Sequence, residues 1–450
     1  MSTRHTRRGF LKKGLAIGGT ATAAGLFRGP YVLAEPAPSA KLGAAVVGAG
    51  GMGGYSVGAA LAERLVALVD VDDNTIANVM RDVAGRLKDK APKPKVFHDY
   101  RKMLDECHKD LDAVLIATPD HNHAPAAIRA INLGKAAFAQ KPLAHNIYEC
   151  YALAKAAKEK KVPTQMGNQG HCGEGIRRLC EYIWAGAVGN VIETHTILGR
   201  NFGGRGGRPA GKPVPKGLHW DEWLGPAPYR DYHDGLHPFS WRSWRDFGTG
   251  TIGDMACHHF DGFFWALKLG EVKRFTVECL AQTAGSEEMF PQDNVIRWDI
   301  PARGDMPPVK VYSYDHEGLK PEAMKEAERK HNRKFGEFTL FVGDRGLIGS
   351  DARLLPEEKH KQFPEPPKSI PRAHGGPIED LFHACRNGTT PCSNFTDAAG
   401  PLAAFALTGH LAMFAGVGKL VGWDVENMKC TNLPEINQHL RRTYRAGWEV

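Results

Sequence analysis

The stretch Gly48-Ala49-Gly50-Gly51-Met52-Gly53 decides the fold of this chain. It follows an apolar run, 42–47, and precedes a helix-compatible segment, 54–63. In that context a G-x-G-x-x-G string predicts a strand, a tight turn and a helix whose N-terminus receives the pyrophosphate of a dinucleotide. The string alone also fits an ordinary glycine-rich turn, so the neighbouring elements must decide between the two.

An acidic residue ends the second expected strand. Residues 65–69 are apolar and lead to Asp70, 22 positions after Gly48. A carboxylate at this place can accept hydrogen bonds from the ribose hydroxyls. No arginine lies directly beside Asp70, which favours NAD over NADP as the cofactor. We therefore predict that the cofactor-binding residues of this unit are Gly48, Gly50, Gly51, Met52, Gly53 and Asp70.

Strand-like and helix-like segments alternate from residue 42 to about residue 166. The expected strands are 42–47, 65–70, 95–97, 112–117, 136–139 and 163–166, and the expected helices are 54–63, 74–88, 99–107, 124–133 and 146–160. This alternation predicts a Rossmann-type, doubly wound parallel sheet over residues 41–167. Its ligands should bind beyond the carboxyl ends of the strands.

The pattern changes after Asn168. A helix near 174–185 is followed by strand-like runs at 190–199, 272–282, 293–300, 308–315 and 337–342. These runs predict a second domain, 168–450, of α+β type with a large, mostly antiparallel open sheet. The apolar run 401–417 contains His410 and glycines, so we expect a buried helix there. The fold class is therefore α/β, with a second, α+β domain.

The N-terminal segment has the pattern of an export signal. Arg7-Arg8 lies in a twin-arginine motif, a Gly- and Ala-rich stretch follows at 14–27, and small residues precede a cleavage point after Ala34. We predict a twin-arginine signal peptide over 1–34, export by the twin-arginine machinery and, in a Gram-negative cell, a periplasmic location. A basic tail with a chance arginine pair is the alternative.

The net charge of +8 is concentrated in that segment. Residues 1–34 hold six basic and no acidic side chains, so the rest of the chain carries 52 basic against 50 acidic residues. This balance argues against a nucleic-acid partner and against membrane binding after processing. The nine cysteines are odd in number and form no C-x-x-C motif. We therefore predict no metal site and no disulfide framework.

Two expected strand ends carry polar residues. Thr118, Pro119 and His123 follow the fourth strand, and Gln140 precedes Lys141-Pro142 after the fifth. We expect Thr118, Pro119, His123 and Gln140 to line the nicotinamide end of NAD. Pro142 keeps Lys141 on extended backbone, where its ammonium can donate to a sugar hydroxyl and lower the hydroxyl's pKa. A capped turn and a solvated surface lysine are the alternatives.

A further candidate group lies in the glycine-rich turn and helix at 248–261. Asp254 and His258 are four residues apart, so they share one helix face, and Asp261 lies near it. A carboxylate beside an imidazole can orient it and raise its pKa for proton transfer. We predict that His258 is the base and that Asp254 orients it. A helix-capping aspartate with a core histidine, or a metal site, are the alternatives, and His259 receives no role.

Aromatic residues are dense between 218 and 247. Four of the nine tryptophans fall in this stretch, interleaved with arginines. Aromatic faces stack on sugar rings, and arginine binds hydroxyls or carboxylates, so we predict that Trp241, Arg242 and Trp244 contact the substrate. A long loop held to the core by its aromatic side chains is a compatible alternative.

These motifs, in this order, resemble the Gfo/Idh/MocA oxidoreductase family over residues 40–450. The resemblance implies a catalytic group of Lys141, Asp254 and His258, with the uncharged Gln140 where the family usually has Glu. It also implies sugar or cyclitol substrates and a homodimer or homotetramer formed through the open sheet. The segment 240–247 resembles the exported branch of the family, whose substrates are mostly unassigned.

Together, these observations predict an exported NAD-dependent oxidoreductase that acts on a sugar or cyclitol hydroxyl. Free nicotinamide cofactor is scarce outside the cytoplasm, so the protein should carry its NAD and regenerate it in place. That requirement also favours an alternative, a glycoside hydrolase or epimerase that oxidises its substrate transiently with no net redox change. A carbohydrate-binding protein without catalytic activity is the third hypothesis.

Overall fold

The computed structural model describes residues 41–450, so the predicted signal peptide, 1–34, lies outside the described residues. The N-terminal part is a parallel sheet of six strands, as predicted. Its spatial order is β3 (Lys95–Phe97), β2 (Arg64–Val69), β1 (Gly43–Val47), β4 (Ala113–Ile116), β5 (Ala136–Ala139) and β6 (Thr164–Met166). This order places the strand reversal between β1 and β4, where such sheets bind dinucleotides.

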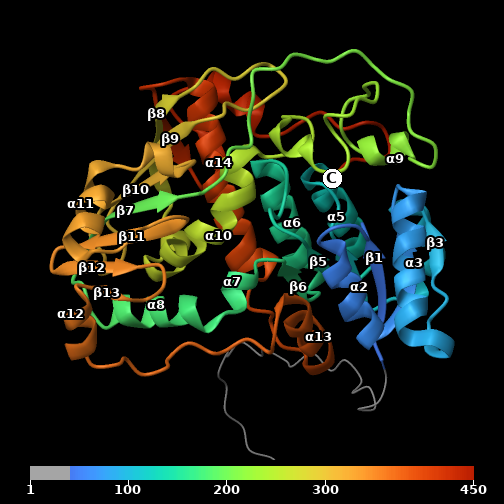
Figure 1. The fold of residues 1–450 in the computed structure, drawn as a ribbon, viewed down its shortest axis with the longest axis horizontal. Helices are drawn as coiled ribbons and strands as arrows, with labels where there is room; N and C mark the ends of the chain where they lie inside the picture. Colours follow the sequence, from blue (N-terminus) through green and yellow to red (C-terminus); the bar gives the residue numbers. More distant parts are fainter. Residues whose placement is uncertain (1–40) are drawn as a thin grey trace, which may run out of the picture. The chain divides into compact units, whose positions relative to one another are not determined.

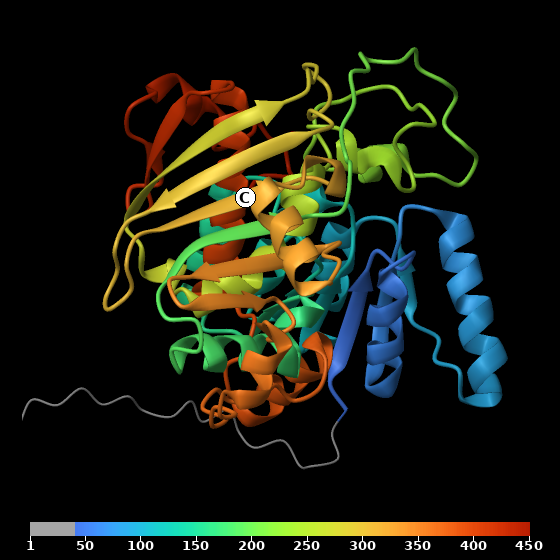
Figure 2. The same ribbon diagram turned by 60° about the vertical axis from the view of Figure 1, so that its left-hand side comes forward.

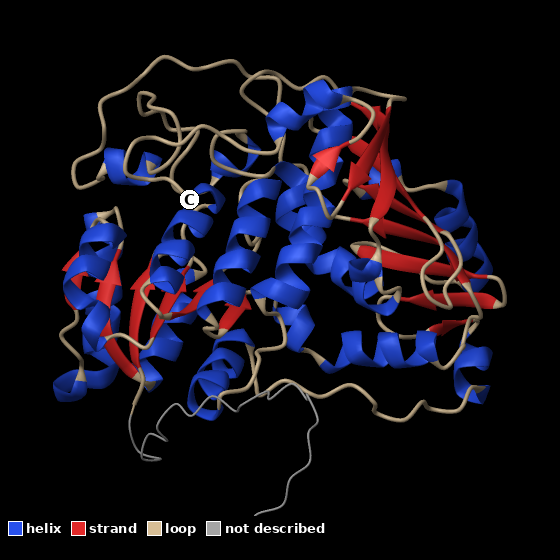
Figure 3. Cartoon of the chain, turned by 180° about the vertical axis from the view of Figure 1, so that it is seen from behind, coloured by secondary structure: helices blue, strands red, loops and turns tan. Residues whose placement is uncertain are grey.

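Five helices connect these strands, within a residue or two of the expected ranges (Figure 3). They are α2 (Gly53–Ala62), α3 (Asp73–Leu87), α4 (Tyr100–Cys107), α5 (His123–Asn132) and α6 (Ile147–Lys160). The starts of α3, α4 and α6 are set by side-chain caps, since Asp72, Asp99 and Asn146 each accept a hydrogen bond from a first-turn N–H.

The C-terminal part contains a sheet of nine strands, which is antiparallel except between β7 and β10 (Figure 2). Its order is β13 (Leu354–Leu355), β12 (Gly346–Gly349), β11 (Phe338–Gly343), β7 (Val191–Ile197), β10 (Val309–Tyr314), β9 (Asn294–Ile300), β8 (Arg274–Gln282), β14 (Leu420–Asp424) and β15 (Lys429–Cys430). The expected runs correspond to the five central strands. Sequence reasoning missed the four outer strands because they are short and lack a clear period-two pattern.

Eight further α-helices follow within residues 169–415 (Figure 1). They are α7 (Gln169–Cys172), α8 (Glu174–Trp184), α9 (Trp220–Leu224), α10 (Gly250–Ala266), α11 (Glu322–His331), α12 (Glu357–Gln362), α13 (Pro377–Asn387) and α14 (Gly400–Ala415). The core lies where α10 and α14 meet the sheet, and Phe260, Trp298 and Phe405 pack there edge to face or stacked. The stretch Phe395–Ala415 is long and apolar enough to cross a membrane, and 83% of its apolar window is buried within the protein.

Helix α13 returns to the N-terminal sheet. Its residues Ile378, Leu381 and Phe382 share one hydrophobic cluster with Val46 and Leu68 of the parallel strands. The N-terminal sheet is therefore completed by a helix that is more than two hundred residues away in the sequence.

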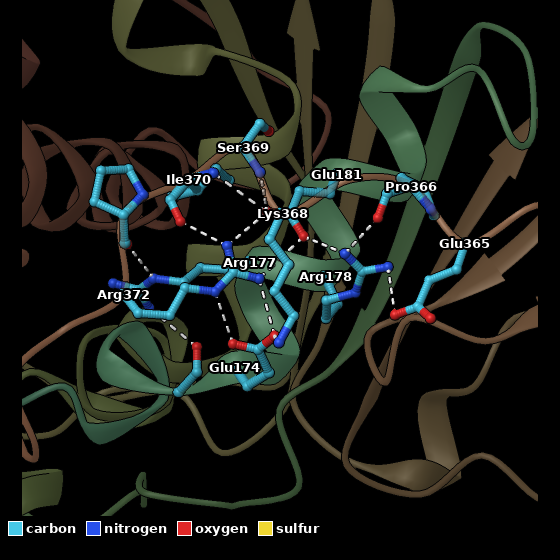
Figure 4. A network of polar contacts seen from close by, with 12 residues as sticks. Glu174, Arg177, Arg178, Glu181, Glu365, Pro366, Lys368, Ser369, Ile370 and Arg372 are labelled. Atoms are coloured by element: carbon cyan, nitrogen blue, oxygen red, sulfur yellow. Dashed lines mark hydrogen bonds and ion pairs between the residues drawn. The ribbon is translucent and has the colours of Figure 1, made fainter.

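The Pro-rich segment before α13 is held against α8 by a buried ion-pair network (Figure 4). Glu181, whose side chain is 1% exposed, accepts hydrogen bonds from Arg178, Arg372 and the backbone N–H groups of Ser369 and Ile370. Arg372 also pairs with Glu174 at the surface. A buried carboxylate with this many donors fixes the path of residues 365–372 over the helix.

Candidate functional site

The glycine turn has the geometry that a bound pyrophosphate requires. Gly48 has φ +82°, and a Cβ there would lie 2.8 Å from the carbonyl carbon of Ala117. A Cβ at Gly53 would lie 2.1 Å from the carbonyl oxygen of Gly48, so only glycine lets α2 approach β1 this closely. The first N–H groups of α2 donate to carbonyls of the turn, but those of Gly51 and Met52, just before the helix, have no acceptor among residues 41–450, so a phosphate can accept from them. The residues present therefore fit a dinucleotide.

Asp70 holds the same turn in place. Its carboxylate accepts hydrogen bonds from the N–H of Ala49 at 2.7 Å and the N–H of Asp72 at 3.0 Å. Burial raises the pKa of Asp70, and these backbone donors oppose that rise. Each oxygen keeps a second lone pair, so the carboxylate can still accept from a ribose hydroxyl.

The predicted nicotinamide residues fall into two groups. Thr118 Oγ1 and Gln140 Nε2 are buried and have no hydrogen-bond partner among residues 41–450, so they are free to bind a ligand amide. His123 instead links the two loops, since its ring nitrogens lie 2.7 Å from the carbonyl of Pro142 and 2.8 Å from that of Thr118. Burial lowers the pKa of His123 to about 4, so the ring is neutral near pH 7 and donates to one of these two carbonyls. Sequence reasoning did not foresee this contact.

Lys141 and Asp254 form a partly buried ion pair at the edge of the sheet. The Lys141 ammonium donates to Asp254 Oδ2 at 3.1 Å and to the Asp254 carbonyl at 3.2 Å. The guanidinium of Arg242 lies 3.3 Å from the other carboxylate oxygen. Three residues that are distant in sequence and were predicted to be functional thus meet here, and Asp254 is the anion that positions both cations.

His258 has a different orienting partner from the one predicted. No hydrogen bond joins it to Asp254 within the described chain, and its Nδ1 lies 3.2 Å from the side-chain oxygen of Asn168. The Asn168 amide group donates to the Cys257 carbonyl at 2.7 Å and to Asp261 Oδ2 at 2.9 Å. In this structure Asn168, and not Asp254, bonds the His258 ring, because the Asp254 carboxylate is occupied by Lys141 and Arg242.

This arrangement selects one tautomer of His258. Because the Asn168 amide group is already a donor, its oxygen must accept, and Nδ1 of His258 must carry the proton. The Nε2 lone pair is then available, and it makes no hydrogen bond to any residue of 41–450. Burial, with a smaller effect from the charge of Lys141, lowers the pKa of His258 to about 4. The ring is therefore neutral near pH 7. A neutral imidazole with a free Nε2 can accept a proton.

Asp261 supports this orientation from behind. It accepts hydrogen bonds from Asn168 and, at 2.8 Å, from Nδ1 of the buried His171. Burial of His171 opposes its protonation, but the adjacent Asp261 carboxylate raises the His171 pKa overall. Neither Asn168 nor His171 was proposed from the sequence, because each lies about 90 positions from its partner.

Asp120 is a buried carboxyl group that sequence reasoning did not select. It is 1% exposed, and its Oδ2 accepts a hydrogen bond from the Thr249 hydroxyl at 2.7 Å. Burial, with a smaller effect from the negative charge of Asp254, raises the pKa of Asp120 to about 7. The site therefore holds a carboxyl group that titrates near neutrality beside the Lys141–Asp254 pair.

The aromatic loop serves mainly as a support. Trp241 and Trp244 are both 5% exposed and belong to one hydrophobic cluster, and their indole N–H groups donate to the carbonyls of Pro238 and Gly235. Of the three predicted substrate residues, Arg242 is the one that contacts the Lys141–Asp254 pair. The tryptophans fix the loop that carries it.

Asp73, His98 and His219 form a group of potential metal donors beside the turn after β2. The Nε2 atoms of His98 and His219 lie 3.3 Å and 3.5 Å from Asp73 Oδ1. However, the two rings are stacked, with centroids 3.5 Å apart and an interplanar angle of 14°. A metal ion must lie near the plane of each imidazole that it binds, and one ion cannot do so for two parallel stacked rings. This geometry fits a stacked pair better than a metal centre.

Comparison with known proteins identifies a family and a solved structure that this chain resembles. The model of an oxidoreductase family with an NAD-binding Rossmann fold matches residues 42–168, and the model of its C-terminal alpha/beta domain matches residues 192–292. The crystal structure of an aldose-aldose oxidoreductase from Caulobacter crescentus, complexed with glycerol, is similar, with a TM-score of 0.56 and 16% identity over 85% of this chain and 99% of that one.

Two curated relatives align over shorter stretches. A levoglucosan dehydrogenase of Pseudarthrobacter phenanthrenivorans is 27% identical over 164 residues, which are 36% of this chain and 34% of that protein. An alpha-N-acetylgalactosaminidase of Shewanella oneidensis is 31% identical over 131 residues, which are 28% of each chain. The alignments thus span about a third or less of these two relatives.

Proposed function

Since this chain belongs to the Gfo/Idh/MocA family of oxidoreductases, whose N-terminal domain is an NAD-binding Rossmann fold, we propose that it is an NAD-dependent enzyme acting on a sugar or cyclitol hydroxyl. The observation that carries this proposal is the pairing of His258, with Nδ1 held by Asn168 and Nε2 free, with the Lys141–Asp254 ion pair. When bound, NAD supplies the hydride acceptor.

The residues of the site would divide the proton chemistry. His258 Nε2 accepts the hydroxyl proton, while the Lys141 ammonium donates a hydrogen bond to the same oxygen and stabilises its developing negative charge. Asp254 keeps Lys141 and Arg242 in place, and Arg242 offers further donors to substrate hydroxyls. Asp120 adds a buried carboxyl group that can hold or release a proton near pH 7.

A segment of the C-terminal part supports the proposal that NAD is tightly held. We call residues 217–219 the strap. The N–H of Asp73 donates to the Gly217 carbonyl at 2.9 Å, and the N–H of His219 donates to the Val71 carbonyl at 2.8 Å. The strap is therefore fastened to the turn directly after Asp70, next to the expected ribose. We propose that the strap covers that end of the cofactor and must detach before NAD can leave.

The test uses purified full-length protein. Mass spectrometry after denaturation should find NAD close to one per chain, and addition of substrate sugars should change the absorbance of the bound nicotinamide. Protein that contains no NAD and takes none up would refute the proposal and revive a purely carbohydrate-binding role.

One comparison favours a second candidate, a glycoside hydrolase that oxidises and re-reduces its substrate, because an alpha-N-acetylgalactosaminidase aligns with this chain at 31% identity. The two candidates differ in their products. Net oxidation leaves reduced nicotinamide or a second, reduced sugar, whereas the redox-neutral reaction releases a free sugar from a glycoside with no lasting change in nicotinamide absorbance. An epimerase would convert the sugar without cleaving it.

The place of action and the assembly are further parts of the proposal. The Arg7-Arg8 pair supports export by the twin-arginine machinery, with a periplasmic location in a Gram-negative cell. Cell fractionation of wild type and an Arg7→Lys, Arg8→Lys variant tests this, and equal export of both would contradict it. The open nine-stranded sheet supports a homodimer or homotetramer, which light scattering can test.

A further inference from the structure

Two cysteines that are 220 positions apart lie in contact. Cys172 ends α7, Cys392 lies between α13 and the helical turn Phe395–Ala399, and their Sγ atoms are 3.3 Å apart. Both are partly accessible, whereas six of the other seven cysteines are buried. A disulfide bond is about 2.05 Å long, so closure needs a movement of little more than 1 Å. The prediction of no disulfide framework was made from sequence spacing, which does not reveal a pair of this kind.

We propose that Cys172 and Cys392 are a redox-active dithiol that a low-molecular-weight disulfide oxidises to an intramolecular disulfide. The inference goes beyond the proposed oxidoreductase function and does not depend on it. The two cysteines form a second site, which reacts with a low-molecular-weight disulfide and not with a sugar.

The surroundings of the pair favour Cys392 as the attacking sulfur. The Cys172 thiol can donate to Cys392 Sγ, and the amide of Gln165 lies 3.6 Å from each sulfur. The Cys172 hydrogen bond, opposed by burial and aided by the charge of His171, lowers the pKa of the Cys392 thiol to about 7. The carboxylate of Asp380, which accepts from the Cys392 backbone N–H, acts in the opposite direction. Cys392 is therefore the more acidic thiol of the pair.

Oxidation proceeds by two thiol–disulfide exchanges. The Cys392 thiolate attacks one sulfur of the reagent RSSR, which forms a mixed disulfide and releases RS⁻. The Cys172 sulfur then gives up its proton and attacks the Cys392 sulfur, which releases a second RS⁻ and forms the bond between the two side chains. The protein loses two electrons and two protons, and the reagent is reduced to two thiols.

The pair adjoins the support of the candidate site. Cys172 follows His171, which bonds Asp261, and Asp261 bonds the Asn168 that orients His258. On the other side, Ser393 bonds strand β6 through the N–H of Met166 and the side chain of Gln165. A disulfide would therefore clamp the short helix α7 to the segment 391–393, directly behind the residues that set the His258 tautomer.

The test treats folded, full-length protein with oxidised glutathione, then alkylates under denaturing conditions. We expect seven of the nine cysteines to be alkylated, a mass decrease of about 2 Da before alkylation and a single cross-linked peptide pair containing Cys172 and Cys392. Dithiothreitol should reverse all three changes.

Matched variants separate this pair from general thiol reactivity. Cys172→Ser and Cys392→Ser should each abolish the cross-link, and Cys172→Ser should instead accumulate glutathione on Cys392. Cys385→Ser, at the other partly accessible cysteine, should leave the cross-link unchanged. Nine alkylated cysteines after oxidation, or a cross-link between other cysteines, would overturn the proposal. Either result would leave the proposed function intact, because that is read from bound NAD and sugar turnover.

Discussion

Asn168 determines which nitrogen of His258 carries the proton, since its side-chain oxygen lies 3.2 Å from His258 Nδ1 while its amide group is committed to Cys257 and Asp261. The base is thus oriented by an amide and not by a carboxylate. An amide oxygen stabilises the protonated ring far less than a carboxylate would, so burial and the charge of Lys141 keep the ring neutral near pH 7.

Replacing Asn168 should change both the rate and its pH dependence. Asn168→Ala removes the acceptor for Nδ1, and we expect turnover to fall roughly 100-fold, the lower range of what a positioned general base contributes. Asn168→Asp places a carboxylate beside the ring and should raise the His258 pKa from about 4. The acidic limb of the pH profile should therefore move to higher pH. The pH profile of kcat measures this. An unchanged acid limb in Asn168→Asp would mean that His258 is not the base.

Replacing Lys141 should abolish turnover without emptying the cofactor site. Lys141→Met removes the donor to the reacting oxygen and leaves Asp254 with Arg242 alone. We expect kcat to fall about 100- to 1,000-fold, with bound NAD unchanged. Lys155→Met, at a side chain that is 76% exposed, is the matched control and should behave like wild type. Full activity of Lys141→Met would remove this residue from the mechanism.

Asp120 should make folding stability depend on pH. Its folded pKa, about 7, lies above the ordinary value of 3.8, so its contribution is fully present below about pH 4 and is lost as pH rises through 7. We expect Asp120→Asn to gain about 3 kcal/mol of stability relative to wild type between pH 5 and pH 8, because about two pKa units of the shift lie in that interval. Urea unfolding at both pH values measures the difference. A pH-independent difference would contradict the raised pKa.

The strap should control cofactor release. Gly217 has φ +82°, and a Cβ there would lie 3.2 Å from the side chain of Asp73, so Gly217→Val strains the strap. We expect NAD to be released at least about tenfold faster, which corresponds to about 1.4 kcal/mol. Gly207→Val, where a Cβ meets nothing within 4 Å, is the matched control. Fluorescence or mass spectrometry during dialysis follows the release, and equal rates for the two variants would show that the strap does not retain NAD.

Protonation of Glu181 should account for most of the stability that the segment 365–372 loses in acid. Burial opposes ionisation of Glu181, but hydrogen bonds from two guanidinium groups and backbone N–H groups lower its pKa to about 2, against an ordinary 4.5. Its contribution is present above about pH 4.5 and is lost as pH falls toward 2. Glu181→Gln should cost about 3 kcal/mol at pH 7 and flatten this dependence.

Glu174 provides the comparison for that measurement. It shares Arg372 but its side chain is 45% exposed, so Glu174→Gln should cost less than about 1 kcal/mol. Equal effects of the two substitutions would mean that burial does not decide the strength of this network.

Residues close together in sequence could be interpreted correctly from the sequence alone. The turn Gly48–Gly53, the strands β1 to β6 and the position of Lys141 at a strand end all follow from local patterns of glycine, apolar and polar residues. The central strands of the second sheet were also found, because they are long enough to show their pattern. The outer strands β12 to β15 were not, because they are short and, unlike the equally short strands β3 to β6, do not stand in a regular alternation with helices.

The sequence by itself therefore determined the family, the cofactor class and the edge of the sheet at which the chemistry belongs, because each rests on a backbone shape that neighbouring residues specify. Only the tertiary structure decided which side chains touch. In the folded chain Asp254 bonds Lys141 and Arg242. His258 bonds Asn168, and Cys172 contacts Cys392. Such contacts join residues 12 to 220 positions apart, and the packing of α7 and α10 against the segments that carry Lys141, Arg242 and Cys392, rather than helical spacing, selects the partner.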